Sequence, residues 1–184
     1  VETLLKERST SQIGTIPDMS SYLISAGGKR LRPMITIAAS CAMGGGKAND
    51  AAHKLATAVE FIHTATLLHD DVVDDSDLRR GKKAAKMLWG NSASILVGDF
   101  LFARSFSLMV ETNSLRILEI LSEASSVIAE GEVHQLAAIG RADLPVAEYM
   151  QIVEAKTAAL FEAAARAGAL TSAPEGAESD ALAE

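Results

Sequence analysis

Apolar residues recur at helical spacing along nearly the whole chain, with polar residues between them on the opposite faces. The spacing predicts helices over residues 2–10, 31–43, 51–68, 92–111, 114–138 and 145–168. We find no segment with the strict alternation of a half-buried strand, so none is expected. The pattern therefore predicts an all-α bundle.

Caps and breakers set the boundaries of these helices. Pro17 predicts a break, and the glycine run 44–46 ends the helix before it. Asn49 or Asp50 can cap the helix that runs on toward residue 70, and Pro145 fits the first turn of the last full helix. Residues 180–184 read as the start of one more helix.

Five aspartates fall within eight residues at the end of the 51–68 helix: Asp70, Asp71, Asp74, Asp75 and Asp77. Asp70 and Asp74 share a helix face, whereas Asp71 points about 100° away. Two hard oxygen ligands on one face suit Mg²⁺, which takes its remaining ligands from water and substrate phosphates. A solvated acidic helix end is the alternative, but apolar residues precede the cluster and cations follow it. The pattern favours a metal–phosphate site.

Basic residues lie on both sides of this cluster in the sequence. Lys29 and Arg32, on a glycine-led turn that enters a helix, can converge on one anion, and the helix N-terminal amides add donors. Arg79 and Arg80 follow the aspartates directly. Each cluster alone is weak evidence, since basic turns are usually solvated. Together with the aspartates they predict a three-part site for phosphate groups.

Other polar residues interrupt apolar helical segments. His63 lies two turns before Asp70 on the same side, where it is either a satisfied core residue or a donor to phosphate. Glu60 and His63 also match the Glu-x-x-His signature of di-metal bundles, but that signature needs a second copy, which this sequence lacks. Lys156 and Thr157 are either surface residues or a cavity-facing pair. Residues 130–135 form a polar patch lining the same cavity or an ordinary solvated stripe.

Composition narrows the class of protein. The net charge of −7 argues against nucleic-acid binding, and 48% hydrophobic but only 4% aromatic residues indicate an aliphatic core. Cys41 is the one cysteine, so no internal disulfide forms and a reduced, cytoplasmic setting fits. No uninterrupted apolar run reaches membrane-spanning length, and residues 1–10 are too charged for a signal peptide.

Several motifs over residues 27–161 occur together: Gly-Gly-Lys-Arg-Leu-Arg-Pro at 27–33, Glu-Phe-Ile-His-Thr at 60–64, the aspartates running into Leu-Arg-Arg-Gly at 78–81, Gly-Asp-Phe-Leu-Phe at 98–102, Glu-Gly-Glu at 130–132 and Lys-Thr-Ala-Ala-Leu at 156–160. In this order they resemble the trans-polyprenyl diphosphate synthases of the long-chain, octaprenyl and decaprenyl type. The resemblance implies an isoprenoid synthase-type helical bundle around a deep central cavity, usually in a homodimer. It also implies a Mg²⁺-dependent prenyltransferase that condenses isopentenyl diphosphate with an allylic diphosphate such as farnesyl diphosphate.

The resemblance also implies roles for particular residues. Those expected to bind isopentenyl diphosphate are Lys29, Arg32, His63 and Arg80. Those expected to hold the allylic diphosphate are Arg79, Lys156 and Thr157. Asp70 and Asp74 would bind Mg²⁺, and the catalytic group would comprise Asp70, Asp71, Asp74, Arg79 and Lys156.

Product length follows from the residues just ahead of the aspartates. Short-chain members of the resembled family place aromatic residues there, whereas Ala65 and Thr66 are small and Ile62 lies on roughly the same face. We therefore expect a long product, roughly C30–C50, of the kind used for quinone side chains. The floor of the cavity would lie deeper, at Phe102, Phe106 or Met109.

The family carries a second aspartate-rich motif, and the chain ends before one appears. Residues 1–184 are thus expected to form one incomplete all-α domain that is inactive by itself. Alternatives are a non-catalytic subunit of a heteromeric prenyl synthase, a shorter-chain geranylgeranyl or farnesyl synthase, and a terpene cyclase, which would not need the motif at 27–33. No membrane span is expected, only peripheral membrane contact for product release.

Overall fold

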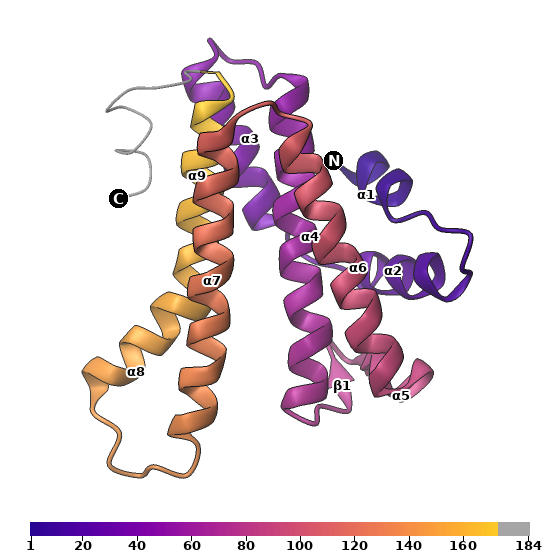
Figure 1. Ribbon diagram of the computed structural model, residues 1–184, viewed down its shortest axis with the longest axis vertical. Helices are drawn as coiled ribbons and strands as arrows, with labels where there is room; N and C mark the ends of the chain where they lie inside the picture. Colours follow the sequence, from indigo (N-terminus) through magenta and orange to yellow (C-terminus); the bar gives the residue numbers. More distant parts are fainter. Residues whose placement is uncertain (173–184) are drawn as a thin grey trace.

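The protein is almost entirely helical in the computed structural model, which describes residues 1–172 (Figure 1). The elements are α1 (Glu2–Arg8), α2 (Thr15–Ser25), α3 (Leu31–Met43), α4 (Asp50–Val73), β1 (Leu78–Arg79), β2 (Lys82–Lys83), α5 (Ala85–Trp89), α6 (Asn91–Val110), α7 (Leu115–Ala138), α8 (Val146–Val153), the π-helical turn η1 (Glu154–Ala158) and α9 (Ala159–Leu170). The all-α prediction is confirmed.

The long helix α4 lies at the centre of the packing. It runs beside α6 and also contacts α3 and α9, while α7 packs on α9 (Figure 1). Its apolar residues explain this position, since Leu55, Val59, Phe61 and Leu68 are all fully buried. The side chain of Asn49 accepts a hydrogen bond of 2.9 Å from the Ala52 amide and so begins the helix.

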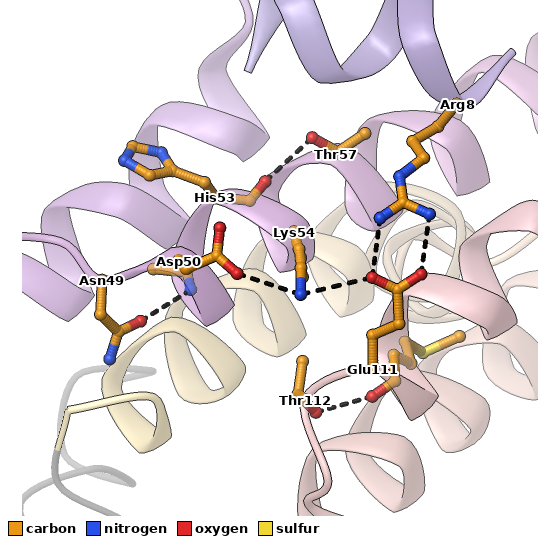
Figure 2. Close-up of polar contacts among 10 residues, drawn as sticks. Arg8, Asn49, Asp50, His53, Lys54, Thr57, Glu111 and Thr112 are labelled. Carbon is orange, nitrogen blue, oxygen red and sulfur yellow. Dashed lines mark hydrogen bonds and ion pairs between the residues drawn. The ribbon is translucent and has the colours of Figure 1, made fainter.

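An ion-pair network fastens the N-terminal end of α4 (Figure 2). Lys54 Nζ lies 3.0 Å from Asp50 Oδ2 and 3.3 Å from Glu111 Oε2. Glu111, just after α6, also accepts two hydrogen bonds of 2.8 Å from the guanidinium of Arg8. The network therefore ties α1 and the end of α6 to the start of α4.

Helices α3 and α9 approach closely because Gly168 has no side chain. A Cβ at that position would lie 2.3 Å from the carbonyl oxygen of Thr36. Beyond α9, Thr171 Oγ1 bonds to Ser40 Oγ at 2.9 Å, and Asn49 Nδ2 donates to the Thr171 carbonyl at 2.7 Å. The end of α9 is thus held to the end of α3 and the start of α4.

Three local features differ from the sequence prediction. Pro17 does not break a helix but lies in the first turn of α2, where its missing N–H is tolerated. Residues 78–83 form a short antiparallel hairpin, with Leu78 opposite Lys83 and Arg79 opposite Lys82, where no strand was expected. The helix expected over 145–168 is divided by η1. The helix start expected at 180–184 lies outside the described residues.

Helix α6 is long and apolar enough to cross a membrane when judged by length and composition, and no other helix in residues 1–172 is. In this fold it packs along α4 and contributes Val97, Leu101, Leu108 and Met109 to the core. The packing of the bundle therefore explains part of its apolar character, while Ile95 and Leu96 of the same helix are exposed.

Candidate active site

A basic cavity of about 440 Å³ opens at the start of α3. Four predicted residues, Lys29, Arg32, His63 and Arg80, line it together with Phe161 of α9. The turn 27–30 can enter the helix so sharply because Gly27 and Arg30 both adopt positive φ, +84° and +50°. The structure thus brings together the residues expected to bind isopentenyl diphosphate.

The cations of this cavity are held in different ways. The guanidinium of Arg30 donates to Glu60 at 2.5 Å, to Glu2 at 2.8 Å and to the Ile24 carbonyl at 2.7 Å, so it serves the fold. Arg32 lies over the ring of Phe161, 4.2 Å from the centroid, and its Nε is buried without a hydrogen-bond partner among residues 1–172. Lys29 is exposed at the rim. Arg32 and Lys29 are therefore better placed than Arg30 to meet an anion.

His63 faces this cavity as a neutral imidazole. Burial, together with the positive charges of Arg32 and Arg80, lowers the pKa of His63 to about 3. A neutral ring still carries one N–H and can donate it to a phosphate oxygen. His63 therefore contributes a hydrogen-bond donor near neutral pH and no charge.

A second cavity, of about 380 Å³, lies between α4, α6 and α7. Its polar end is formed by Asp70, Asp99 and Glu132, and its apolar part includes Ala65 and Phe102. Burial raises the pKa of Asp70 to about 6, and the facing carboxylate of Glu132 adds to the rise. Carboxylates here repel one another, so the polar end is suited to a cation.

The predicted product-length residues are placed unequally around this second cavity. Ala65 and Thr66 line it, and so does Phe102. Phe106, one turn further along α6, contacts Phe102 edge to face, with ring centroids 5.2 Å apart. Ile62 is fully buried in the core and is not among the lining residues, and Met109 is also fully buried.

The remaining aspartates follow their helix positions. Asp74 is exposed and directly follows the last residue of α4. Asp71 is fully buried, and its Oδ1 accepts hydrogen bonds from Arg79 Nε at 2.9 Å and Nη2 at 2.5 Å. Asp75 pairs with Lys86. Asp71 and Arg79 are therefore engaged with each other and fasten the hairpin, a pairing that the sequence did not predict.

Lys156 lies in the π-helical turn η1. Its Nζ is 2.7 Å from Glu132 Oε2 and donates to Gln135 Oε1 at 2.6 Å. Thr157, beside it, lines a third cavity, of about 370 Å³, between the end of α7 and α8. Glu132 and Gln135 were not assigned roles from the sequence, although the polar patch at 130–135 was visible in it.

The donors at the second cavity suit Mg²⁺ bound jointly with a substrate. Within residues 1–172 no group of three or more His, Cys, Asp or Glu side chains forms a ready-made metal site. Asp70 lines the cavity, and Asp74, which is exposed one turn further on and does not line it, can supply a second carboxylate from outside. Mg²⁺ commonly takes one or two carboxylates together with water and phosphate oxygens. Burial raises the pKa of Asp70, and the nearby carboxylates of Glu132 and Asp74 add to the rise, so a cation here would relieve an unfavourable charge.

Residues 14–184 match the sequence model of the polyprenyl synthetase family. The octaprenyl diphosphate synthase of Escherichia coli is 49% identical over 166 residues, which are 90% of this chain and 51% of that protein. The chain thus spans about half the length of this relative.

Solved structures of polyprenyl synthases have the same fold as this chain. A polyprenyl synthase from Caulobacter crescentus, in complex with calcium and isoprenyl diphosphate, superposes with a TM-score of 0.94 at 57% identity, over 98% of this chain and 55% of that one. A decaprenyl diphosphate synthase from Rhodobacter capsulatus gives a TM-score of 0.93 at 49% identity, with coverages of 98% and 55%. Taken with the two cavities and the motifs that line them, these matches establish that the chain belongs to the polyprenyl synthetase family.

Proposed function

We propose that the full-length protein is a cytoplasmic, Mg²⁺-dependent prenyltransferase that condenses isopentenyl diphosphate with an allylic diphosphate. The observation that carries this proposal is the pair of cavities flanking α4. One is lined by cations and His63, and the other has carboxylates at one end and apolar residues beyond them. Two diphosphate substrates, one of them attached to a hydrocarbon chain, match these two cavities in charge and polarity.

In this reaction the C1–O bond of the allylic diphosphate breaks, and its electron pair leaves with the diphosphate. The double bond of isopentenyl diphosphate attacks the allylic cation, and the proton lost afterwards goes to the released diphosphate. Lys29, Arg32, Arg80 and the neutral His63 would hold isopentenyl diphosphate. Lys156 and the neighbouring Thr157 would bind the leaving diphosphate. Arg79 would bind it as well, a role that rests on the family resemblance alone.

Asp70 and Asp74 would hold Mg²⁺, which supplies charge neutralisation for the leaving group when it is bound. The solved relative in complex with calcium and isoprenyl diphosphate supports a divalent cation beside a diphosphate. The apolar part of the second cavity would exclude water from the allylic cation.

We further propose a long product, roughly C30–C50, of the type used for quinone side chains. Ala65 and Thr66 leave the cavity wall of α4 free of aromatic rings. The relatives named for octaprenyl and decaprenyl diphosphate support this length.

The homodimer is proposed from an exposed apolar face. Met87 and Leu88 of α5 and Ile95 and Leu96 of α6 are between 41% and 66% exposed, although all are large hydrophobic residues. Such a patch on a soluble enzyme is typical of a contact between subunits. Leu96→Glu should convert a dimer to a monomer in light scattering. An unchanged mass would exclude this face as the contact.

The test of the function is incubation of the full-length protein with labelled isopentenyl diphosphate, with and without an allylic primer. Label should enter a long prenyl product only when primer and Mg²⁺ are both present. Asp70→Asn and Asp74→Asn should each lower kcat by orders of magnitude while the circular dichroism spectrum is unchanged. Product formed without isopentenyl diphosphate would indicate a cyclase. Turnover seen only with a second polypeptide would indicate a subunit of a heteromeric synthase.

A further inference from the structure

We propose that Glu132, assisted by Gln135, is a positioning residue that holds Lys156 beside the carboxylate end of the second cavity. The inference rests on the proposed function, in which Lys156 meets the allylic diphosphate. Glu132 lines the same cavity as Asp70, whereas Lys156 lines the neighbouring cavity under α8. Glu132 therefore lies between the lysine and the aspartates.

The contacts leave Lys156 partly available. Its ammonium has three N–H donors, and two are used by Glu132 at 2.7 Å and Gln135 at 2.6 Å. The third can point to a phosphate oxygen without either contact being broken. The side chain of Lys156 is only 18% exposed, so the two acceptors confine its long stem to one region.

The backbone around Lys156 is built for a close approach to α7. A Cβ at Gly131 would lie 2.7 Å from Ala155 Cβ and 3.2 Å from the backbone nitrogen of Lys156. The π-helical turn that carries Lys156 thus packs directly against Gly131, the residue before Glu132. Such turns inside α-helices are frequent at functional sites.

Charge gives Glu132 a second reason to be paired. An unpaired carboxylate facing Asp70 would add negative charge where a diphosphate has to bind. The ion pair with Lys156 offsets that charge, and it also keeps the lysine from reaching across to Asp70. Glu132 would therefore act through Lys156, without touching the substrate.

The test compares Glu132→Gln with Glu130→Gln in the full-length protein. Glu130 is an exposed carboxylate on the same helix and lies outside the cavities described here, so it is a matched control. Glu132→Gln should raise the KM for the allylic substrate about 5- to 20-fold, while the KM for isopentenyl diphosphate changes less than about twofold. Glu132→Asp, which keeps the charge but shortens the reach, should give an intermediate value.

A double-mutant cycle separates positioning from a general loss of structure. Once Lys156→Ala has removed the lysine and left Glu132 unpaired, adding Glu132→Gln should not raise the allylic KM further, and the loss of the unpaired carboxylate should lower it. Additive effects, a change in the KM for isopentenyl diphosphate, or a value equal to that of Glu130→Gln would overturn the proposal.

Binding of inorganic pyrophosphate with Mg²⁺, measured by calorimetry, tests whether Glu132 positions Lys156 even if no prenyl transfer is found. Absence of transfer in the wild type would count against the proposed function alone. Weaker pyrophosphate binding in Glu132→Gln, with a larger loss in Lys156→Ala, would support the positioning role of Glu132. Unchanged binding in Glu132→Gln would overturn it.

Discussion

At Gly28 the absence of a side chain lets the guanidinium of Arg80 lie against the backbone of the basic cavity. A Cβ there would be 2.7 Å from Arg80 Nη1 and 3.2 Å from Arg30 Nη1. Because Arg80 Nη1 is the end of a flexible side chain, Gly28→Ala should displace it without unfolding the protein. We expect the KM for isopentenyl diphosphate to rise about tenfold, the loss of roughly one charge-assisted hydrogen bond.

The matched control for this substitution is Gly14→Ala, where an added Cβ would meet no atom within 4 Å. It should leave both the KM and the melting temperature close to those of the wild type. Steady-state kinetics at saturating allylic substrate make the comparison. Equal KM values in the two variants would show that Arg80 does not bind this substrate.

Asp70 is the carboxylate for which folding raises the pKa to about 6. Its pKa rises from 3.8 in the unfolded chain to about 6, chiefly through burial. The folded state therefore binds the proton more tightly, and this contribution to stability is lost as the pH rises from about 4 through 6. Without Mg²⁺, Asp70→Asn should have a higher melting temperature than the wild type at pH 7.5, because the variant has no buried charge. Each 1 kcal/mol of unfolding free energy that remains after solvent screening of the Asp70 charge should raise the melting temperature by about 2–4 °C.

Melting curves of the full-length protein at pH 4.5 and 7.5, with chelator, measure this difference. The advantage of Asp70→Asn should shrink at pH 4.5, where Asp70 is protonated in the folded wild type. Mg²⁺ added at pH 7.5 should raise the melting temperature of the wild type more than that of the variant. A difference that is the same at both pH values would mean that Asp70 does not titrate with a raised pKa.

Among the helices, the pairing of α3 with α9 depends on the absence of a side chain at Gly168. At Gly168 an added Cβ would meet the backbone of Thr36 at 2.3 Å, and backbone cannot rotate away. Gly168→Ala should therefore lower the free energy of unfolding by about 1–3 kcal/mol, the usual range for overpacking. Urea denaturation measures it, again with Gly14→Ala as the control, and an unchanged midpoint would show that the two helices separate easily.

The helices that sequence reasoning located well are those with strong local signals. The extent of α4 follows from its unbroken apolar pattern and from Asn49, whose side chain caps its first turn. The π-helical turn was missed because Glu154, Ala155 and Lys156 are ordinary helix formers. Its form accompanies the close approach of η1 to Gly131, a tertiary contact that no local pattern encodes.

In the candidate site, too, residues with a local sequence signal were predicted and residues that depend on tertiary contacts were not. The residues of the basic cavity were predicted because Lys29 and Arg32 share one short motif, while His63 and Arg80 belong to two other motifs of the resembled family. The pairing of Asp71 with Arg79 was missed because it depends on a hairpin of two-residue strands, too short to show alternation. Glu132 and Gln135 lack a role until the fold brings η1 against α7.

For the molecule as a whole, the volume of the second cavity should control the size of the product. Ala65 is a small residue on the wall that α4 contributes. A phenylalanine there would place a ring in the cavity, and a close-packed core cannot move aside without strain. Ala65→Phe in the full-length protein should therefore shorten the product sharply, because Ala65 lies only about one and a half helical turns from Asp70.

Chromatography of the dephosphorylated products gives their chain lengths. Ser126→Ala, an exposed position on α7 that does not line this cavity, serves as the control and should leave the product unchanged. Farnesyl diphosphate released by the wild type, or an unchanged product from Ala65→Phe, would show that this wall does not limit the chain.

Helix α4 can be viewed as a ruler. Its 24 residues rise about 36 Å, and one turn of about 5.4 Å is close to the length of one extended isoprene unit. Asp70 stands near one end of this ruler, and the ion network of Figure 2 marks the other. Ile62 and Phe61 fill the turn just beyond the cavity. Each added unit then requires about one more turn of α4 to part from its neighbours, so chain length would be counted in steps of about four residues along a single helix.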